Sequence, residues 1–199
     1  KDYLRAINKN KRLKIIVGDI NNAILLNKIL NKVDLVIHLA AESHVDRSFQ
    51  SIKKFINTNV QGTRTLLDAC VVNQVKKIIH ISTDEVYGEI YHGNFRESQI
   101  LSPTNPYSAS KAAAEMIIKG YQKSFKLDIN IIRSNNIFGT RQFPEKIIPS
   151  CIYSLINNKK VLIHGSGKQK RTFLHVDDFS KAIFLIIKNW KNNEIYNLG

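Results

Sequence analysis

The stretch 76-KKIIHISTDEVYG-88 joins an apolar run to a threonine, two adjacent carboxylates and a tyrosine. Residues 76–82 read as a buried β-strand, so the polar residues fall where that strand reaches its loop. Similar apolar runs recur along the chain and alternate with helical patterns. The predicted strands are 13–17, 33–41, 76–82 and 128–134, and the predicted helices are 22–30, 53–73 and 106–125. This alternation predicts an α/β fold with a doubly wound parallel sheet of Rossmann type, covered on both faces.

From residue 135 the alternation loosens. This part of the chain predicts a helix at 147–157, short strands at 161–164 and 171–175, and a helix at 177–190. Such a segment would suit a smaller lobe over the carboxyl edge of the sheet. We therefore expect residues 1–134 to form the Rossmann-type core and residues 135–199 to form mainly a substrate-binding lobe, interleaved with the core.

The composition is that of one ordinary globular domain, with 199 residues of which 43% are apolar. A formal net charge of +14 would suit a nucleic-acid partner, but the lysines are spread along the chain. No basic stripe with interleaved aromatic residues appears. The phosphates of a nucleotide would benefit from the same positive field. We expect an anionic small molecule as the partner and no nucleic acid.

Membrane and metal sites are also disfavoured. No window approaches about 18 uninterrupted apolar residues, and the first residues lack the apolar region of a signal peptide. We expect a cytoplasmic protein without a membrane partner. The six histidines show no metal-ligand spacing, so we expect no metal.

Polar and small residues follow three of the predicted strands. They lie in the segments 39-LAAESHVDRS-48, 83-TDEVYG-88 and 135-NNIFG-139. In open α/β sheets, ligands bind outside the carboxyl ends of the strands, so these segments are the candidate site. Taken alone, the small residues of 39–43 are equally explained by a tight turn between strand and helix.

The segment 104-TNPYSASKAAAE-115 adds a chemical pair. Asn105 is a plausible N-cap with Pro106 at the first helical position, which places Tyr107 and Lys111 on one helical face. A nearby ammonium favours the phenolate, so we expect a lowered Tyr107 pKa and proton exchange with a sugar or alcohol hydroxyl. The same spacing also occurs by chance on amphipathic helices.

The chain resembles the extended short-chain dehydrogenase/reductase family, and within it the nucleotide-diphosphate-glucose 4,6-dehydratases. The resemblance rests on six segments that occur in the family's order from near residue 13 to the end. They are HLAAESHVDRS, TNVQGT, ISTDEVYG, TNPYSASKAAAE, RSNNIFGTRQFPEKIIP and GSGKQKRTFLHVDD. The segment STDEVYG is the one that points to dehydration.

The resemblance implies an NAD-dependent hydro-lyase. Such an enzyme oxidises C4 of the glucose ring, loses water across C5 and C6, and returns the hydride to C6. By resemblance Asp84 is the acid for the leaving hydroxyl and Glu85 is the base at C5. Thr83 would hydrogen-bond the 4-hydroxyl and Tyr107 would take its proton, with Lys111 beside them. Adjacent carboxylates can share this work if their environments separate their pKa values.

Further binding residues are carried over by position. The implied cofactor contacts are Asp19, Ile20, Leu39, Ala40, Ala41, Glu42, Ser43, Thr58, Tyr107, Lys111 and Asn136. The implied substrate contacts are Ser43, Thr83, Asn135, Lys146, Ile147, Leu162, Ile163, His164 and Arg171. Arg171 would hold the diphosphate, a task suited to a planar cation with five donors, although it could equally be a surface ion-pair residue.

Two features of the family pattern are missing. The chain lacks the glycine-rich phosphate loop and the acidic residue that contacts the ribose, so the choice between NAD and NADP is not readable. We attribute both absences to truncation before Lys1 and expect the chain as given to bind cofactor poorly. The sequence also leaves open whether the substrate is dTDP-glucose or UDP-glucose.

Three alternatives stay open. A nucleotide-sugar 4-epimerase or nucleotide-glucuronate decarboxylase of the same fold would share Tyr107 and Lys111 but would not need Asp84 and Glu85. A catalytically silent NAD-binding regulatory protein would be expected to have lost at least one of these four residues.

The helices at 53–73 and 106–125 resemble those that pair across a two-fold axis in the family, so we expect a homodimer.

Overall fold

A parallel sheet of four strands forms the centre of the computed structural model, which describes residues 12–90, 92–163 and 167–199 of the 199-residue chain. The strand order is β1-β2-β3-β6, and all three pairings are parallel. The strands are β1 (Leu35–His38), β2 (Lys77–Thr83), β3 (Ile129–Ser134) and β6 (Ile195–Leu198). The predicted strands at 33–41, 76–82 and 128–134 are thereby confirmed, each with slightly different ends.

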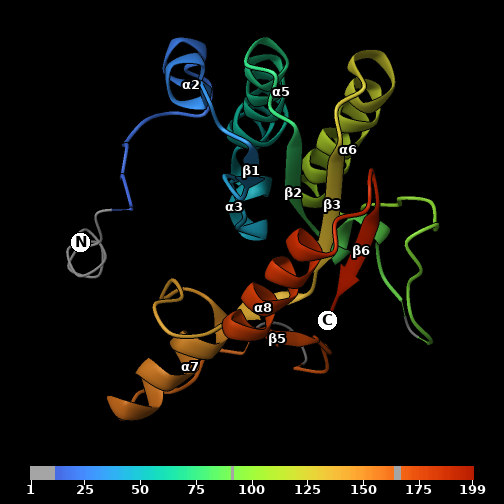
Figure 1. The fold of residues 1–199 in the computed structure, drawn as a ribbon. Coiled ribbons are helices and arrows are strands. Elements are labelled where there is room, and N and C mark those ends of the chain that lie inside the picture. The colour runs from blue at the N-terminus through green and yellow to red at the C-terminus, as the bar shows by residue number, and fades with distance from the viewer. Residues whose placement is uncertain (1–11, 91, 164–166) are drawn as a thin grey trace.

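Helices cover both faces of this sheet, as the doubly wound prediction requires (Figure 1). Among the described residues, three helices pack on one face and one packs on the other. They are α2 (Ala23–Leu30), α5 (Gly62–Val72) and α6 (Pro106–Phe125) on the first face, and α8 (Val176–Lys188) on the second. Successive strand residues alternate between the two cores, so that Ile78 packs under α5 and α6 while Ile79 packs under α8.

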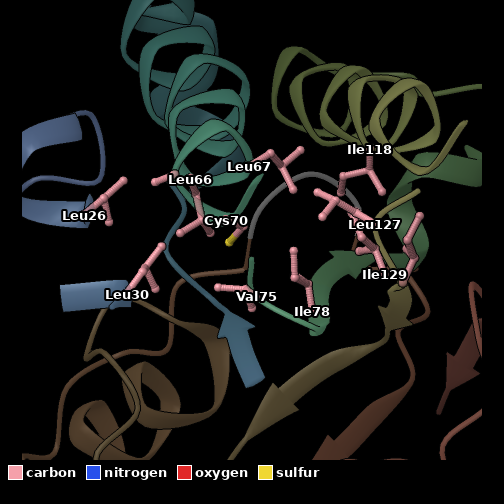
Figure 2. Close-up of a cluster of buried hydrophobic side chains, with 12 residues drawn as sticks. Leu26, Leu30, Leu66, Leu67, Cys70, Val75, Ile78, Ile118, Leu127 and Ile129 are labelled. Atoms are coloured by element: carbon pink, nitrogen blue, oxygen red, sulfur yellow. The ribbon is translucent and has the colours of Figure 1, made fainter. Parts of the chain in front are cut away.

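The larger core lies between the sheet and helices α2, α5 and α6. Figure 2 shows Leu66, Leu67 and Cys70 of α5 facing Ile78 and Ile129 of the strands. All five side chains are buried. Burial of about 25 cal/mol per Å² of apolar surface is the main force that holds the helices on the sheet.

The predicted helix at 53–73 consists of three consecutive helical pieces. They are α4 (Ile52–Phe55), a π-helical segment (Ile56–Gln61) and α5, and a short helix α3 (Val45–Gln50) precedes them. A π-helical turn inside a helix frequently marks a functional site. Here the turn contains the buried side chain of Asn59.

The chain then forms a small lobe beyond the carboxyl ends of the strands (Figure 1). A two-stranded parallel sheet joins β4 (Asn136–Phe138) to β5 (Phe173–His175), and α7 (Ile147–Ile156) lies beside it in Figure 1. The helices predicted at 147–157 and 177–190 are confirmed as α7 and α8. The chain returns to the main sheet through α8 and β6, so its last residues belong to the core.

Two predicted strands are wrong. Residues 13–17 and 161–163 have no strand structure, and Val17 and Leu162 are 94% and 78% exposed. An apolar run becomes a strand only when another strand offers its backbone groups for pairing. No described strand pairs with either segment, so the apolar pattern alone was not sufficient. Residue 164 of the second run lies outside the described residues.

Candidate active site

The carboxyl ends of β1, β2 and β3 lie side by side and bring the three candidate loops to one edge of the sheet. The parallel register pairs His38 with His80 and Thr83 with Ser134. The segments 39–43, 83–85 and 135–136 therefore leave the sheet next to one another. The sequence prediction that the site follows these strands is consistent with this topology.

Thr83 ends β2 and caps the short 3₁₀ helix Asp84–Tyr87. Its Oγ1 accepts a hydrogen bond from the Glu85 backbone N–H at 3.3 Å and donates to Asp84 Oδ1 at 3.2 Å. Asp84 and Glu85 are the first two residues of this helix. Both carboxylates are half-buried, which gives them surroundings different from bulk water.

Helix α6 begins beside this turn. Asn105 is its N-cap and Pro106 its first residue, as predicted. Tyr107 and Lys111 lie on the buried face of the helix, and Lys111 Nζ donates to the Ile81 carbonyl at 2.6 Å. The lysine is thereby anchored to β2 two residues before Thr83, which fixes α6 against the Thr83–Tyr87 segment.

The surroundings shift the pKa values of the titratable groups of the site in different directions. Burial raises the pKa of Asp84, and the charge of Glu85 raises it further. Burial also raises the pKa of Tyr107, with a further contribution from Glu85, while a hydrogen bond with Thr83 acts in the opposite direction. Burial lowers the pKa of Lys111 to about 8. The predicted lowering of the Tyr107 pKa is wrong for the protein by itself, because burial and the two carboxylates dominate.

Asn59 is a site residue that sequence reasoning missed. Its Oδ1 accepts from the Glu42 N–H at 2.8 Å, and its Nδ2 donates to the Glu42 carbonyl at 3.0 Å and to Ser110 Oγ at 2.8 Å. One buried amide thus holds the loop after β1 against α6. The neighbouring Thr58, which was predicted to contact the cofactor, is half-buried. The available signal was an asparagine inside an otherwise helical pattern.

A cavity of about 290 Å³ lies next to the predicted adenine-side residues. Its lining includes Asp19, Ile20, Leu39 and Ala40, four of the predicted cofactor contacts. Gly62 lets Ile20 approach α5, since a Cβ at this position would lie 2.5 Å from Ile20 Cγ2. The cavity does not include the Thr83–Glu85 segment, so these two parts of the candidate site are separate.

The predicted substrate residues are only partly brought together. Lys146, the N-cap of α7, donates through Nζ to the Ser43 carbonyl at 3.2 Å. Asn135 follows β3 directly, and its N–H donates to the Leu198 carbonyl at 2.9 Å. Asn136 begins β4. Exposed side chains account for most of the rest, namely Ile147, Leu162, Ile163 and Arg171. His164 lies outside the described residues.

A buried polar cluster holds the Thr83–Tyr87 segment in place. Glu115 accepts from Ser82 Oγ at 2.6 Å and from Arg133 Nη2 at 2.6 Å. Arg133 Nη1 donates to the Tyr87 hydroxyl at 2.6 Å. Ser82 and Tyr87 flank the Thr83–Val86 turn, so one ion pair fixes both ends of it. Sequence reasoning missed this cluster because its members are far apart along the chain.

No group of three or more potential metal ligands occurs within the part of the chain that the structure describes. The helices in that part are all too short or too polar to cross a membrane.

The fold and site define a Rossmann-type α/β protein with a Tyr–Lys pair beside two carboxylates. The chain belongs to the NAD dependent epimerase/dehydratase family, whose model matches residues 2–199. It is 44% identical over 217 residues to the dTDP-D-glucose 4,6-dehydratase of Dictyostelium discoideum, covering 100% of this chain and 50% of that protein. The chain thus spans about half the length of that curated relative.

Two solved structures are also similar. The dTDP-glucose 4,6-dehydratase DesIV from Streptomyces venezuelae, determined with NAD bound, matches with a TM-score of 0.97 and 40% identity over 100% of this chain and 62% of that one. A UDP-glucuronic acid 4-epimerase from Bacillus cereus, in complex with UDP-glucuronic acid and NAD, matches with a TM-score of 0.94 and 32% identity over 100% of this chain and 63% of that one.

Proposed function

We propose that the protein is an NAD-dependent hydro-lyase that converts a nucleotide-diphosphate-glucose to its 4-keto-6-deoxy derivative. The observation that carries this proposal is the adjacent pair Asp84 and Glu85, which stands beside Tyr107 at the carboxyl end of β2. The likeness to dTDP-glucose 4,6-dehydratases supports dTDP-glucose as substrate, with UDP-glucose as the alternative nucleotide.

The residues divide the reaction between them. Tyr107 takes the proton of the 4-hydroxyl, and Thr83 hydrogen-bonds the same oxygen. Glu85 removes the C5 proton, and Asp84 protonates the C6 hydroxyl as it leaves as water. Burial and the neighbouring Glu85 raise the Asp84 pKa, which favours the protonated form that an acid needs.

NAD fits the residues on the other side of the site. Ala40 is exposed and Ala41 half-buried, so the backbone after β1 can be approached closely by a flat ligand, and Asn59 holds this loop in place. The residues proposed to hold the cofactor are Asp19, Ile20, Leu39, Ala40, Ala41, Glu42, Ser43, Thr58, Tyr107, Lys111 and Asn136. When bound, NAD supplies the hydride acceptor for C4 and the hydride donor for C6, and its oxidised ring brings positive charge to the site.

The substrate would lie toward the small lobe. The residues proposed to bind it are Ser43, Thr83, Asn135, Lys146, Ile147, Leu162, Ile163, His164 and Arg171. In this proposal residues 1–134 form the NAD-binding core and residues 135–199 contribute mainly to the substrate lobe.

The function is tested by supplying the full-length protein and NAD with dTDP-glucose and UDP-glucose in separate samples. Mass spectrometry should detect a product lighter by one water, and the faster substrate names the nucleotide. A product of unchanged mass with inverted C4 would favour the epimerase, and loss of carbon dioxide from a glucuronate would favour the decarboxylase.

The roles of the two carboxylates are tested by Glu85→Gln. This variant should still oxidise C4 and form reduced cofactor, because Tyr107 and Lys111 remain, but water loss should fall at least about 100-fold, the range of one general base. Asp84→Asn is the matched variant for the acid. A Glu85→Gln variant that makes the 4-keto-6-deoxy product at the wild-type rate would remove the assignment.

The full-length protein is proposed to be a cytoplasmic homodimer. Apolar side chains are exposed along α4, the π-helical segment and α6, which belong to the long helices expected to pair, and along the preceding α3. They include Phe49, Ile52, Ile56 and Met116. Sedimentation should give twice the monomer mass at micromolar concentration, and Met116→Lys should shift the equilibrium toward monomer. A wild-type protein that sediments only as monomer would contradict this assembly.

A further inference from the structure

The side-chain amide of Asn105 makes one hydrogen bond through its oxygen and another through its nitrogen. Its Oδ1 accepts from the Ser108 backbone N–H at 2.9 Å, which is the N-cap bond of α6. Its Nδ2 donates to Glu85 Oε2 at 2.9 Å. Because the helix supplies a donor on one side, the amide oxygen must face the helix and the NH₂ group must face Glu85. The orientation of the amide therefore follows from the cap.

Capping alone does not require an asparagine. Asparagine, aspartate and serine are about equally good N-caps. An aspartate would cap α6 but would present a carboxylate to Glu85. A serine has a single hydroxyl on a shorter side chain, and with that hydroxyl at the cap no second polar group extends toward Glu85. Among these residues only asparagine caps the helix and donates to the carboxylate at the same time.

We propose that Asn105 is the positioning residue that orients the Glu85 carboxylate for removal of the C5 proton. This role rests on the proposed dehydratase function. Asn105 also begins the helix that carries Tyr107, and its N–H donates to Ser108 Oγ at 3.2 Å in the reciprocal half of the capping box. One residue thereby fixes the positions of both the base and the tyrosine. Proton transfer requires such precise placement of the reacting groups.

The hydrogen bond also joins Glu85 to Asn105 within a group of titratable neighbours. The titratable groups that interact with Glu85 are Asp84 in the same turn and Tyr107 on α6. The bond from Asn105 holds the Glu85 carboxylate in a fixed position beside both of these groups.

The test uses two capping variants of the full-length protein, Asn105→Asp and Asn105→Ser. Both keep the helix cap and lose the donor to Glu85. The control is Ser108→Ala, which removes the reciprocal capping bond but leaves the Asn105–Glu85 bond in place. For each variant, C4 oxidation is followed by absorbance of the reduced cofactor in a single turnover, and water loss by mass spectrometry. Thermal midpoints are measured in parallel.

We expect water loss to slow about tenfold or more in both Asn105 variants, the usual effect of removing one hydrogen bond to a charged group. C4 oxidation and the thermal midpoint should stay close to wild type, so that reduced cofactor accumulates. Ser108→Ala should lower the thermal midpoint without changing the ratio of the two steps.

Two results would overturn the inference in different ways. If both Asn105 variants catalyse water loss at the wild-type rate, Asn105 has no positioning role, and the proposed dehydratase function still stands. If the wild-type protein binds the nucleotide sugar and oxidises or epimerises it but never dehydrates it, the proposed function and the role of Asn105 are both wrong.

Discussion

Glu115 and Arg133 form a buried ion pair, with Arg133 Nη2 at 2.6 Å from Glu115 Oε2. The side chain of Arg133 is 1% exposed and that of Glu115 is 0% exposed. Arg133 also donates through Nε to both Glu115 oxygens at 3.1 and 3.2 Å. The pair joins α6 to β3, and Ser82 and Tyr87 connect it to the turn that contains Asp84 and Glu85. Such a pair contributes specificity of geometry more than net stability, because desolvation offsets much of its attraction.

Removing one partner of this ion pair should lower the free energy of unfolding far more than replacing both partners with apolar residues. Glu115→Gln leaves Arg133 buried without its counter-ion and is expected to lower the free energy of unfolding by about 3–5 kcal/mol. The double variant Glu115→Leu with Arg133→Met removes both charges and should lie closer to wild type. Urea denaturation of the full-length protein measures both. Equal losses in the single and double variants would show that the charges are not coupled.

Two buried histidines should make the fold sensitive to acid. Burial, with Lys111 second, lowers the pKa of His38 to about 3, and burial lowers the pKa of His80 well below 6.5. An unfolded histidine binds a proton near pH 6.5, so the unfolded state binds more protons as the pH falls below that value. The free energy of unfolding should therefore decrease from about pH 6.5 toward pH 3.

His80→Leu isolates one of these contributions. Neither ring nitrogen of His80 has a hydrogen-bond partner within the described residues, so its loss should cost little at pH 7. Below pH 6.5 the slope of stability against pH should be shallower than in wild type by up to about 1.4 kcal/mol per pH unit, the value for one proton. Denaturant titrations between pH 4 and pH 7 measure this slope. Parallel curves for variant and wild type would contradict the assignment.

The loop held by Asn59 should decide cofactor affinity. Asn59→Asp keeps the size of the side chain but loses the donors to the Glu42 carbonyl and to Ser110, and it buries a charge. NAD is expected to bind the full-length variant about tenfold more weakly, as measured by calorimetry. The control is Asn57→Asp, an exposed position in the same π-helical segment, which should bind NAD as wild type does.

Two helical glycines should respond in opposite directions to the same change. Gly62→Ala places a Cβ 2.5 Å from Ile20 Cγ2, so overpacking should destabilise the protein by about 1–3 kcal/mol. A Cβ at Gly120 meets nothing within 4 Å, and Gly120→Ala should stabilise α6 by about 0.5–1 kcal/mol. Thermal denaturation of the two variants measures the difference. A stabilised Gly62→Ala variant would show that Ile20 moves aside freely.

The failed predictions have a common physical cause. The run at 13–17 has a strand's composition but no partner among the described residues, and pairing decides whether such a run becomes a strand. The Tyr107 pKa depends on burial and on Glu85 and Asp84, groups whose distance from Tyr107 no spacing rule supplies. In both cases the missing information was a neighbour in space.

The sequence by itself determined most of the helices, three of the four main strands and their order, because apolar periodicity and capping residues act over a few neighbouring positions. It predicted the parallel sheet, helix α6 from Pro106 to Phe125, and the polar loops after the strands. Only the tertiary structure decided which distant side chains meet. The contacts of Glu115 with Arg133, Asn59 with Glu42 and Asn105 with Glu85 each join residues well separated along the chain, and they form only when the sheet and its helices pack.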